Sequence, residues 1–254
     1  MDLDQNRLIM ILESDHSFYD PDAVFRGDNR LHPGTEDLIL TQFQPDMRVL
    51  DVGCGNGATL IRGHVCFAYG LGIDNDPEHI WIAKDSLGES GAANVEFRLI
   101  DFEENAEILE PESFDFVFSE RGPIDNSSTI RAALNLLRPD GLLFSEVIGK
   151  HHKHEVYQLF KRPEDPTQMT SEQILAELER NGVDIRIFAD LYSKRIYPDV
   201  YAWLQDQCNI WSYLGEPLPM PDDPRIRLFA ERNTIATGEI ETTHHVSWIG
   251  GVRR

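Results

Sequence analysis

The stretch Arg48–Leu60, R-V-L-D-V-G-C-G-N-G-A-T-L, decides the fold of this chain. An apolar run breaks into three glycines, Gly53, Gly55 and Gly57, and then resumes, a pattern that predicts a strand, a tight turn and a helix. Glycine accepts positive φ and has no Cβ, so the backbone of such a turn can approach a ligand closely. Because the helix begins at the turn, its unpaired N–H groups and its positive dipole end favour a carboxylate or phosphate there.

A carboxylate in the same strand, Asp51, changes the kind of ligand that the turn favours. It would repel a pyrophosphate and attract an amine, and an amino-acid moiety carries both an amine and an anion. The spacing Gly53-x-Gly55-x-x-Ala58 also fits the dinucleotide fingerprint, so a nicotinamide-dependent oxidoreductase remains an alternative. That alternative gives no reason for Asp51.

The run V-L-D-V-G-C-G-N-G resembles the first motif of the class I S-adenosylmethionine-dependent methyltransferases, and L-R-P-D-G-L-L at 137–143 resembles a late motif of the same family. These motifs cover about residues 30–150. The resemblance implies an α/β fold with a doubly wound, seven-stranded, mostly parallel sheet of Rossmann-like methyltransferase type, whose last strand is antiparallel. It also implies S-adenosyl-L-methionine as co-substrate.

Acidic residues lie at the ends of three expected strands, 47–52, 68–73 and 95–100. The resemblance implies that Asp51 holds the amine of the cofactor, that Asp74 accepts from the ribose hydroxyls, and that Asp101 accepts from the adenine amino group while Phe102 packs on the ring. A non-catalytic protein that binds the same cofactor would share these residues. The predicted cofactor-binding set is Asp51, Gly53, Cys54, Gly55, Asp74, Asn75, Asp101, Phe102 and Ser119.

The expected fourth strand, 114–119, leads to polar residues on the substrate side. Glu120, Arg121 and Asp125 follow it, near the point between the first and fourth strands where α/β sheets bind ligands. Each of them can contact substrate, and the alternative for Arg121 is an ion pair with a surface carboxylate. The sequence identifies no catalytic base: Tyr19, Glu120 and His245 are candidates by position only.

Several helix starts are readable. Asp76-Pro77 supplies an N-cap and a first-turn proline, and Thr170-x-x-Gln173 is a capping box. Thr35, followed by two acidic residues, is expected to be an N-cap.

We expect a single domain over 1–254, in four parts. Residues 1–33 form an N-terminal arm that either covers the cofactor as a lid, with Tyr19 and Phe25 toward substrate, or packs onto the domain. Residues 34–189 form the core, 190–243 a late insertion acting as a cap, and 244–254 the last strand. The aromatic residues of the insertion line a pocket or, as we favour for most of them, form a satellite core: Tyr192, Tyr197, Tyr201, Trp203 and Trp211.

The charge of the chain disfavours nucleic acid as a partner. There are 44 acidic and 23 basic residues, a net charge of −21, and such a field opposes the approach of a polyanion. We therefore predict a small molecule or a peptide as methyl acceptor, with RNA as the alternative. The pattern says nothing of the oligomeric state.

The three cysteines form no C-x-x-C pair, which predicts neither a disulfide framework nor a zinc site. His151, His152 and His154 lie in a polar turn without partners of a known metal-site spacing, so no metal is predicted. No apolar run approaches the roughly 18 residues that a membrane span needs, and we expect no membrane contact and a cytoplasmic protein.

Overall fold

The computed structural model describes residues 24–26, 34–159, 168–206, 219 and 222–254, and only the backbone of 24–26. The predicted lid residue Tyr19, the side chain of Phe25, Cys208 and Trp211 lie outside these residues.

One mixed sheet runs through the molecule, with the strand order β1-β7-β8-β6-β5-β2-β3-β4. Its strands are β1 Val24–Arg26, β2 Arg48–Val52, β3 Tyr69–Asp74, β4 Val95–Leu99, β5 Phe114–Glu120, β6 Leu137–Ile148, β7 Val183–Tyr197 and β8 Ile240–Arg253. β8 is antiparallel to both of its neighbours, β6 and β7, and every other pair is parallel. The predicted doubly wound sheet of seven strands is confirmed, and the three-residue β1 extends it at the edge beside β7.

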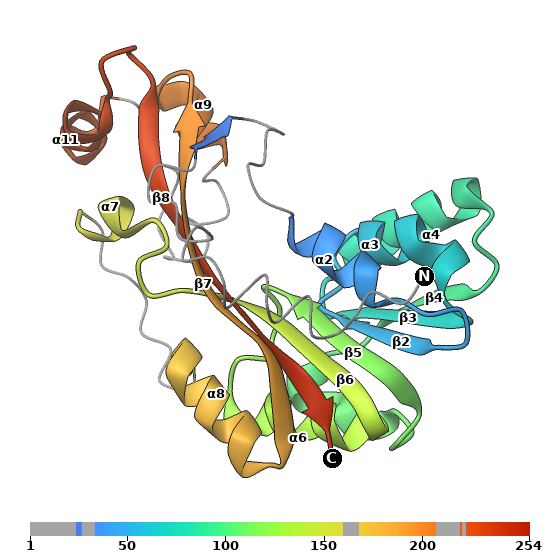
Figure 1. Ribbon diagram of the computed structural model, residues 1–254. Helices are drawn as coiled ribbons and strands as arrows, with labels where there is room; N and C mark the ends of the chain where they lie inside the picture. Colours follow the sequence, from blue (N-terminus) through green and yellow to red (C-terminus); the bar gives the residue numbers. More distant parts are fainter. Residues whose placement is uncertain (1–23, 27–33, 160–167, 207–218, 220–221) are drawn as a thin grey trace.

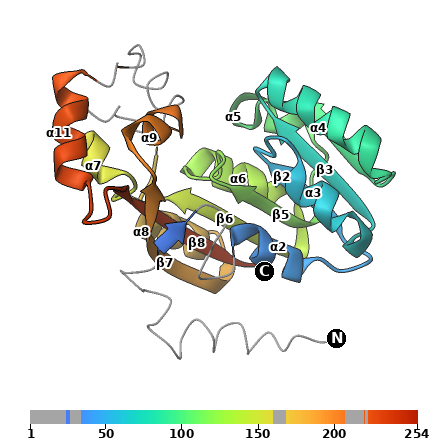
Figure 2. The ribbon, with the colours of Figure 1, turned by 90° about the horizontal axis from the view of Figure 1, so that it is seen from above.

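Helices cover both faces of the sheet (Figures 1 and 2). The described helices are α2 Thr35–Gln42, α3 Ala58–Gly63, α4 Pro77–Ser90, α5 Phe102–Asn105, α6 Ser127–Leu136, α7 His154–Tyr157, α8 Ser171–Arg180, α9 Val200–Asp206 and α11 Pro224–Asn233. α2, α3 and α4 pack on one face, and α5, α6 and α8 on the other. Within the described part of the chain, none of the helices has the length and apolar character needed to cross a bilayer.

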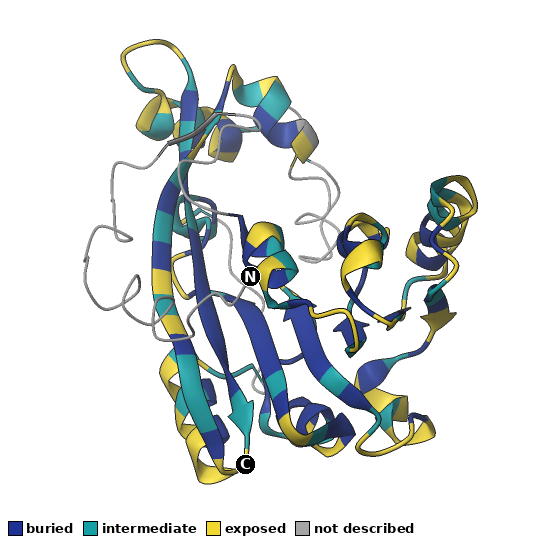
Figure 3. Cartoon of the chain, turned by 45° about the vertical axis from the view of Figure 1, so that its right-hand side comes forward, coloured by how far each residue is buried: buried dark blue, intermediate teal, exposed yellow. Residues whose placement is uncertain are grey.

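The two cores follow from the period-2 alternation of the strands. In β2, Leu50 and Val52 point into the cluster that contains α6, whereas Val49 points into the cluster that contains α2 and α3. All three side chains are fully buried, and Figure 3 shows the central strands as the most buried part of the molecule. The sheet therefore holds the carboxyl ends of its strands on a rigid base.

The helix starts agree with the sequence in two of three cases. Asp76 caps α4 by accepting from the N–H of Glu78, and Thr170 and Gln173 form the capping box of α8. The prediction for Thr35 is wrong. The N-cap of α2 is Gly34, and the Thr35 hydroxyl donates instead to the buried carboxylate of Glu146.

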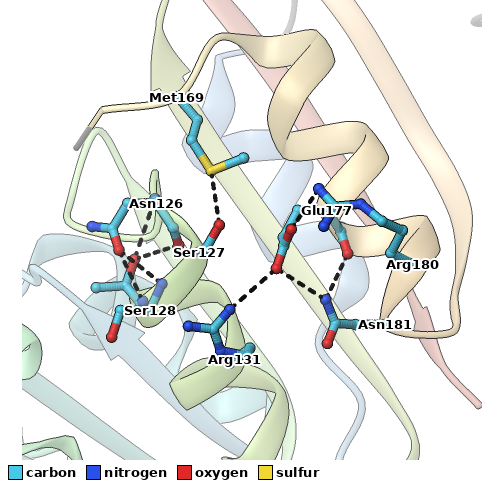
Figure 4. A network of polar contacts seen from close by, with 9 residues as sticks. Asn126, Ser127, Ser128, Arg131, Met169, Glu177, Arg180 and Asn181 are labelled. Carbon is cyan, nitrogen blue, oxygen red and sulfur yellow. Dashed lines mark hydrogen bonds and ion pairs between the residues drawn. The ribbon is translucent and has the colours of Figure 1, made fainter. Parts of the chain in front are cut away.

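A buried carboxylate joins α8 to α6 (Figure 4). The side chain of Glu177 is 4% exposed, and its oxygens lie 3.4 Å from Arg131 Nη1 on α6 and 2.6 Å from Arg180 Nη2 on α8. Asn181 Nδ2 donates to the backbone carbonyl of Glu177 at 2.7 Å. This network fixes α8, and with it the start of β7, on the outer side of the core.

The predicted bounds of the insertion need a correction. Residues 190–197 and 240–243 belong to β7 and β8, which pair along their whole length, so the segment outside the sheet is 198–239. The alternation in β7 is hard to read from the sequence because a serine, Ser193, takes a buried position (3% exposed) and Phe188 takes an exposed one (40%).

The outer end of this strand pair carries a satellite core. α7, α9 and α11 gather there, away from the C-terminus (Figure 1). Tyr197 and Trp203 are buried in this cluster, where Trp203 stacks on Phe229 with ring centroids 3.9 Å apart. The satellite-core interpretation is therefore confirmed for Tyr197 and Trp203. Tyr201 is 65% exposed, and Tyr192 stacks on His245 at 3.9 Å.

Candidate active site at the carboxyl ends of the strands

The glycine turn lies between β2 and β5, where the connections of the sheet change direction. The N–H groups of Gly53 and Cys54 both donate to the carbonyl of Ile73, at 2.8 and 2.9 Å, which ties the turn to the end of β3. This is the crevice at which open α/β sheets bind ligands.

Two glycines of the turn have different surroundings. A Cβ on Gly57 would lie 2.3 Å from Cζ of Phe97, so packing requires the absence of a side chain there. A Cβ on Gly55, whose φ is +51°, would meet no described atom within 4 Å. The backbone at Gly55 therefore faces open space, which is the approach that a cofactor bound against this turn needs.

Three carboxylates surround this turn. Asp51 is 3% exposed, and its pKa is raised well above its ordinary value by burial and then by the charges of Glu120 and Asp74. Mutual repulsion of this kind is relieved when a cation binds among the carboxylates. The site is therefore suited to a positively charged guest such as an ammonium or a sulfonium.

Asp74 supports the turn directly. Its Oδ2 accepts from the N–H of Gly55 at 2.8 Å and its Oδ1 accepts from the N–H of Asp76 at 2.9 Å. An ionised carboxylate has about four acceptor sites, so these two bonds leave capacity for another donor. The contact of Asp74 with the ribose stays a prediction.

The end of β4 lies next to the end of β3. Asp101 Oδ2 accepts from Asn75 Nδ2 at 3.4 Å, and its Oδ1 caps α5. The Phe102 side chain is 4% exposed, sits in the core and lines a groove of about 260 Å³ between α5 and α6. The adenine contacts of Asp101 and Phe102 remain predictions.

Two members of the predicted set lie beneath the turn. Ser119 is fully buried, and its hydroxyl donates to the carbonyl of Val52 at 2.7 Å, which ties β5 to β2. The Cys54 thiol is buried, and burial raises its pKa far above the ordinary range, so it is held as the thiol. Both buried side chains support the turn.

The structure brings Glu120 and Arg121 to the same edge. Glu120 accepts from the Thr59 hydroxyl at 2.7 Å. Arg121 has φ +57°, donates its N–H to the carbonyl of Glu146 at 2.8 Å, and holds its Nε 3.4 Å from Oε1 of Glu146. The predicted ion pair exists, but its carboxylate is a buried one. The third predicted residue is Asp125. Its backbone carbonyl accepts from the N–H of Met169, which precedes α8.

Both ring nitrogens of His245 have hydrogen-bond partners. Its Nδ1 accepts from the backbone N–H of His151 at 3.0 Å, so the ring proton is on Nε2, which donates to Asp190 at 2.9 Å. Both ring nitrogens are therefore engaged in this structure, and the role of His245 as a base stays a prediction. In the described part of the chain, no three His, Cys, Asp or Glu side chains are grouped so as to hold a metal ion.

Sequence reasoning missed two residues near this edge. Glu146 interrupts the apolar run of β6, which was a readable signal of a buried polar group. Lys153 is a partly buried cation in the loop after β6, and no sequence signal marks it.

The chain matches the family model of a methyltransferase domain over residues 43–187. It is 36% identical over 113 residues to the ubiquinone biosynthesis O-methyltransferase of Neisseria meningitidis, covering 42% of this chain and 46% of that protein. It is 32% identical over 162 residues to the protein of the same description from Dechloromonas aromatica, covering 62% and 68%. The chain thus spans about half the length of the first relative and about two thirds of the second.

Solved structures agree on the fold. The YcgJ protein of Bacillus subtilis superposes with a TM-score of 0.61 at 17% identity, covering 88% of this chain and 99% of that one. A geranyl diphosphate methyltransferase in complex with S-adenosylmethionine gives a TM-score of 0.56 at 14% identity, covering 86% and 84%. The family match, the glycine turn and the acidic strand ends together lead to one conclusion: the chain belongs to the class I S-adenosylmethionine-dependent methyltransferases.

Proposed function

We propose that this protein transfers a methyl group from S-adenosylmethionine to an oxygen atom of a small-molecule acceptor. The observation that carries the proposal is the convergence of Asp51, Asp74 and Glu120 on a glycine turn whose Gly55 faces open space. The related O-methyltransferases support oxygen as the accepting atom.

The residues at the turn fit the cofactor, part by part. The backbone at Gly53 and Gly55 and the carboxylate of Asp51 would hold the amino-acid part, Asp74 the ribose, and Asp101 with Asn75 the adenine. The cofactor, when bound, supplies an electrophilic methyl group on a positively charged sulfur. The residues of this chain align the acceptor with that methyl group and exclude water, since in-line displacement depends mainly on alignment.

The identity of the acceptor depends on a part of the chain outside the family model, which ends at residue 187. The outer halves of β7 and β8, with α9 and α11, stand beyond it. Because the relatives are named for ubiquinone biosynthesis, hydroxylated precursors of that kind are the first acceptors to test. We also propose the cytoplasm as the site of action, since the free thiols Cys54 and Cys66 suit a reducing compartment.

The test is transfer of labelled methyl groups from S-adenosylmethionine to a panel of small hydroxylated compounds, with total cellular RNA as a parallel acceptor. We expect label in an organic extract, as a methyl ether, and none in RNA. Calorimetry with S-adenosylhomocysteine and NAD accompanies the assay, and we expect binding of the first only. Label in RNA, or binding of NAD alone, would contradict the proposal.

A further inference from the structure

A partly buried cation lies in the loop after β6, the strand that pairs with β5. Lys153 follows β6 with φ +51°, and its N–H donates to the carbonyl of Thr243 at 2.8 Å. The side chain is partly buried, and no carboxylate of the described residues forms an ion pair with its Nζ. A partly buried ammonium without a counter-charge is unfavourable unless an anion binds beside it.

The neighbours of Lys153 increase this need for an anion. Burial lowers the pKa of Lys153 to about 8; Asp206 acts in the opposite direction, and the charges of Arg195 and Arg121 lower it further. Asp206 already accepts from Arg195 at 3.0 Å and from the Tyr197 hydroxyl at 2.7 Å. Asp206, the carboxylate whose charge raises the pKa of Lys153, is therefore already bonded to other donors.

Arg121 connects Lys153 to the cofactor side. It directly follows Glu120, whose charge acts on Asp51, and its own charge acts on Lys153 and on the buried His152. A non-glycine residue at φ +57° is uncommon, and strained backbone of this kind gathers at ligand sites. Arg121 is 55% exposed, so its guanidinium is accessible beside Glu146.

We infer that the methyl acceptor carries a carboxylate and that Lys153, together with Arg121, binds this carboxylate at the carboxyl ends of β5 and β6. A singly charged anion fits better than a phosphate dianion, because Glu120 and Glu146, which are paired at the ends of β5 and β6, and Asp206, whose charge acts on Lys153, repel additional negative charge. The inference rests on the proposed function, since it names the substrate class of that site.

A positively charged binding site is unusual for this acidic chain. The net charge of −21 disfavours anions in general, so selectivity for an acidic acceptor requires a local positive group. Lys153, in the loop after β6, and Arg121, directly after β5, supply such a group. Opposite charges on the two sides of the site would orient an acceptor whose one end is acidic and whose other end carries the hydroxyl.

The test uses matched pairs of compounds that differ only in a carboxylate, such as 3,4-dihydroxybenzoate and catechol. Binding is measured by calorimetry in the presence of S-adenosylhomocysteine. We expect the wild-type protein to bind the acid of at least one pair roughly tenfold or more tightly than the neutral compound, because a charge-assisted bond is added. Lys153→Gln should remove this difference, and Lys153→Arg should retain most of it.

Lys150→Gln is the control variant. Lys150 is exposed in the same loop, but its charge acts on Asp190 and Glu172 instead of the Lys153 neighbours, so the carboxylate preference should not change. Unchanged affinity for S-adenosylhomocysteine reports that each variant is folded. Equal binding of acid and neutral compound across the panel, or a preference that survives Lys153→Gln, overturns the inference. Carboxylate-dependent binding without methyl transfer would support Lys153 as a carboxylate-binding residue and count against the proposed function.

Discussion

Asp74 Oδ2 accepts a hydrogen bond from the backbone N–H of Gly55 at 2.8 Å, across 19 residues of sequence. One of the three carboxylates thus fixes the loop whose open side the cofactor would occupy. The two acids beside it, Asp51 and Glu120, then act on a turn of fixed shape. Asp74 thus sets the conformation of the loop and also contributes negative charge to the site.

Asp74→Ala should weaken binding of S-adenosylhomocysteine by about 1–3 kcal/mol, because a charged acceptor for the ribose and the support of Gly55 are both lost. The protein should still unfold cooperatively, since Asp74 lies at a strand end. Isothermal calorimetry measures the affinity. Asp74→Asn is the companion variant: it retains one oxygen for a backbone N–H, and it should lose less. Unchanged affinity in both variants would place the ribose contact elsewhere.

The glycines of the turn should separate binding from stability. Gly55→Ala places a methyl group in the open space beside the turn and should abolish cofactor binding. Its cost in the free energy of unfolding is that of the left-handed backbone conformation alone, about 1–2 kcal/mol. Gly57→Ala has the same conformational cost and also meets the ring of Phe97, which should add about 1–3 kcal/mol of destabilisation. Denaturant titration and calorimetry on the two variants give both quantities. Normal cofactor binding by Gly55→Ala would show that the turn is purely structural.

Asp51 should lower the stability of the cofactor-free protein at neutral pH. Its folded-state pKa lies above the ordinary value of 3.8, so the folded protein holds the proton more tightly than the unfolded chain does. The stabilisation from this proton is complete below the unfolded pKa and is lost as the pH rises through the folded pKa. Asp51→Asn removes the buried charge and should raise Tm at neutral pH, by roughly 2–4 °C for each kcal/mol gained. The difference from wild type should shrink in acid, and a constant difference across the range would contradict this assignment.

Local patterns predicted the framework of this protein. The glycine turn, the acidic strand ends and the capping box of Thr170 and Gln173 are set by neighbouring residues, and the structure contains each of them. The same holds for the alternation of β2, because each of its apolar residues faces one of two buried cores. Such features need only a short window of sequence.

Contacts between distant segments could not be predicted in this way. Thr35 donates to Glu146 instead of capping its helix, and Trp248 Nε1 donates to the same carboxylate at 3.0 Å, so three segments meet at one buried group. The tautomer of His245 depends on the backbone N–H of His151, 94 residues away. The environment of Lys153 likewise arises from three elements, and only the folded chain brings them together.

The affinity for S-adenosylmethionine should rise with pH because of the carboxylate of Asp51. Binding places a positive charge beside Asp51 and so lowers its pKa, because the charged form gains a partner. Where Asp51 is protonated in the free protein, binding must release that proton, and affinity falls by up to tenfold for each pH unit below the free-state pKa.

Calorimetry in two buffers of different ionisation enthalpy measures the proton release, and titrations over a pH series give the slope. Sinefungin, in which a carbon bearing an amine replaces the methylated sulfur, and S-adenosylhomocysteine, whose sulfur is neutral, serve as ligands with and without a positive charge near the transferred group. Asp51→Asn should bind more weakly at neutral pH and show a flatter dependence. If the variant keeps the full slope of the wild type, the proton belongs to another group, and Glu120, the neighbour whose charge acts most strongly on Asp51, is the next residue to replace.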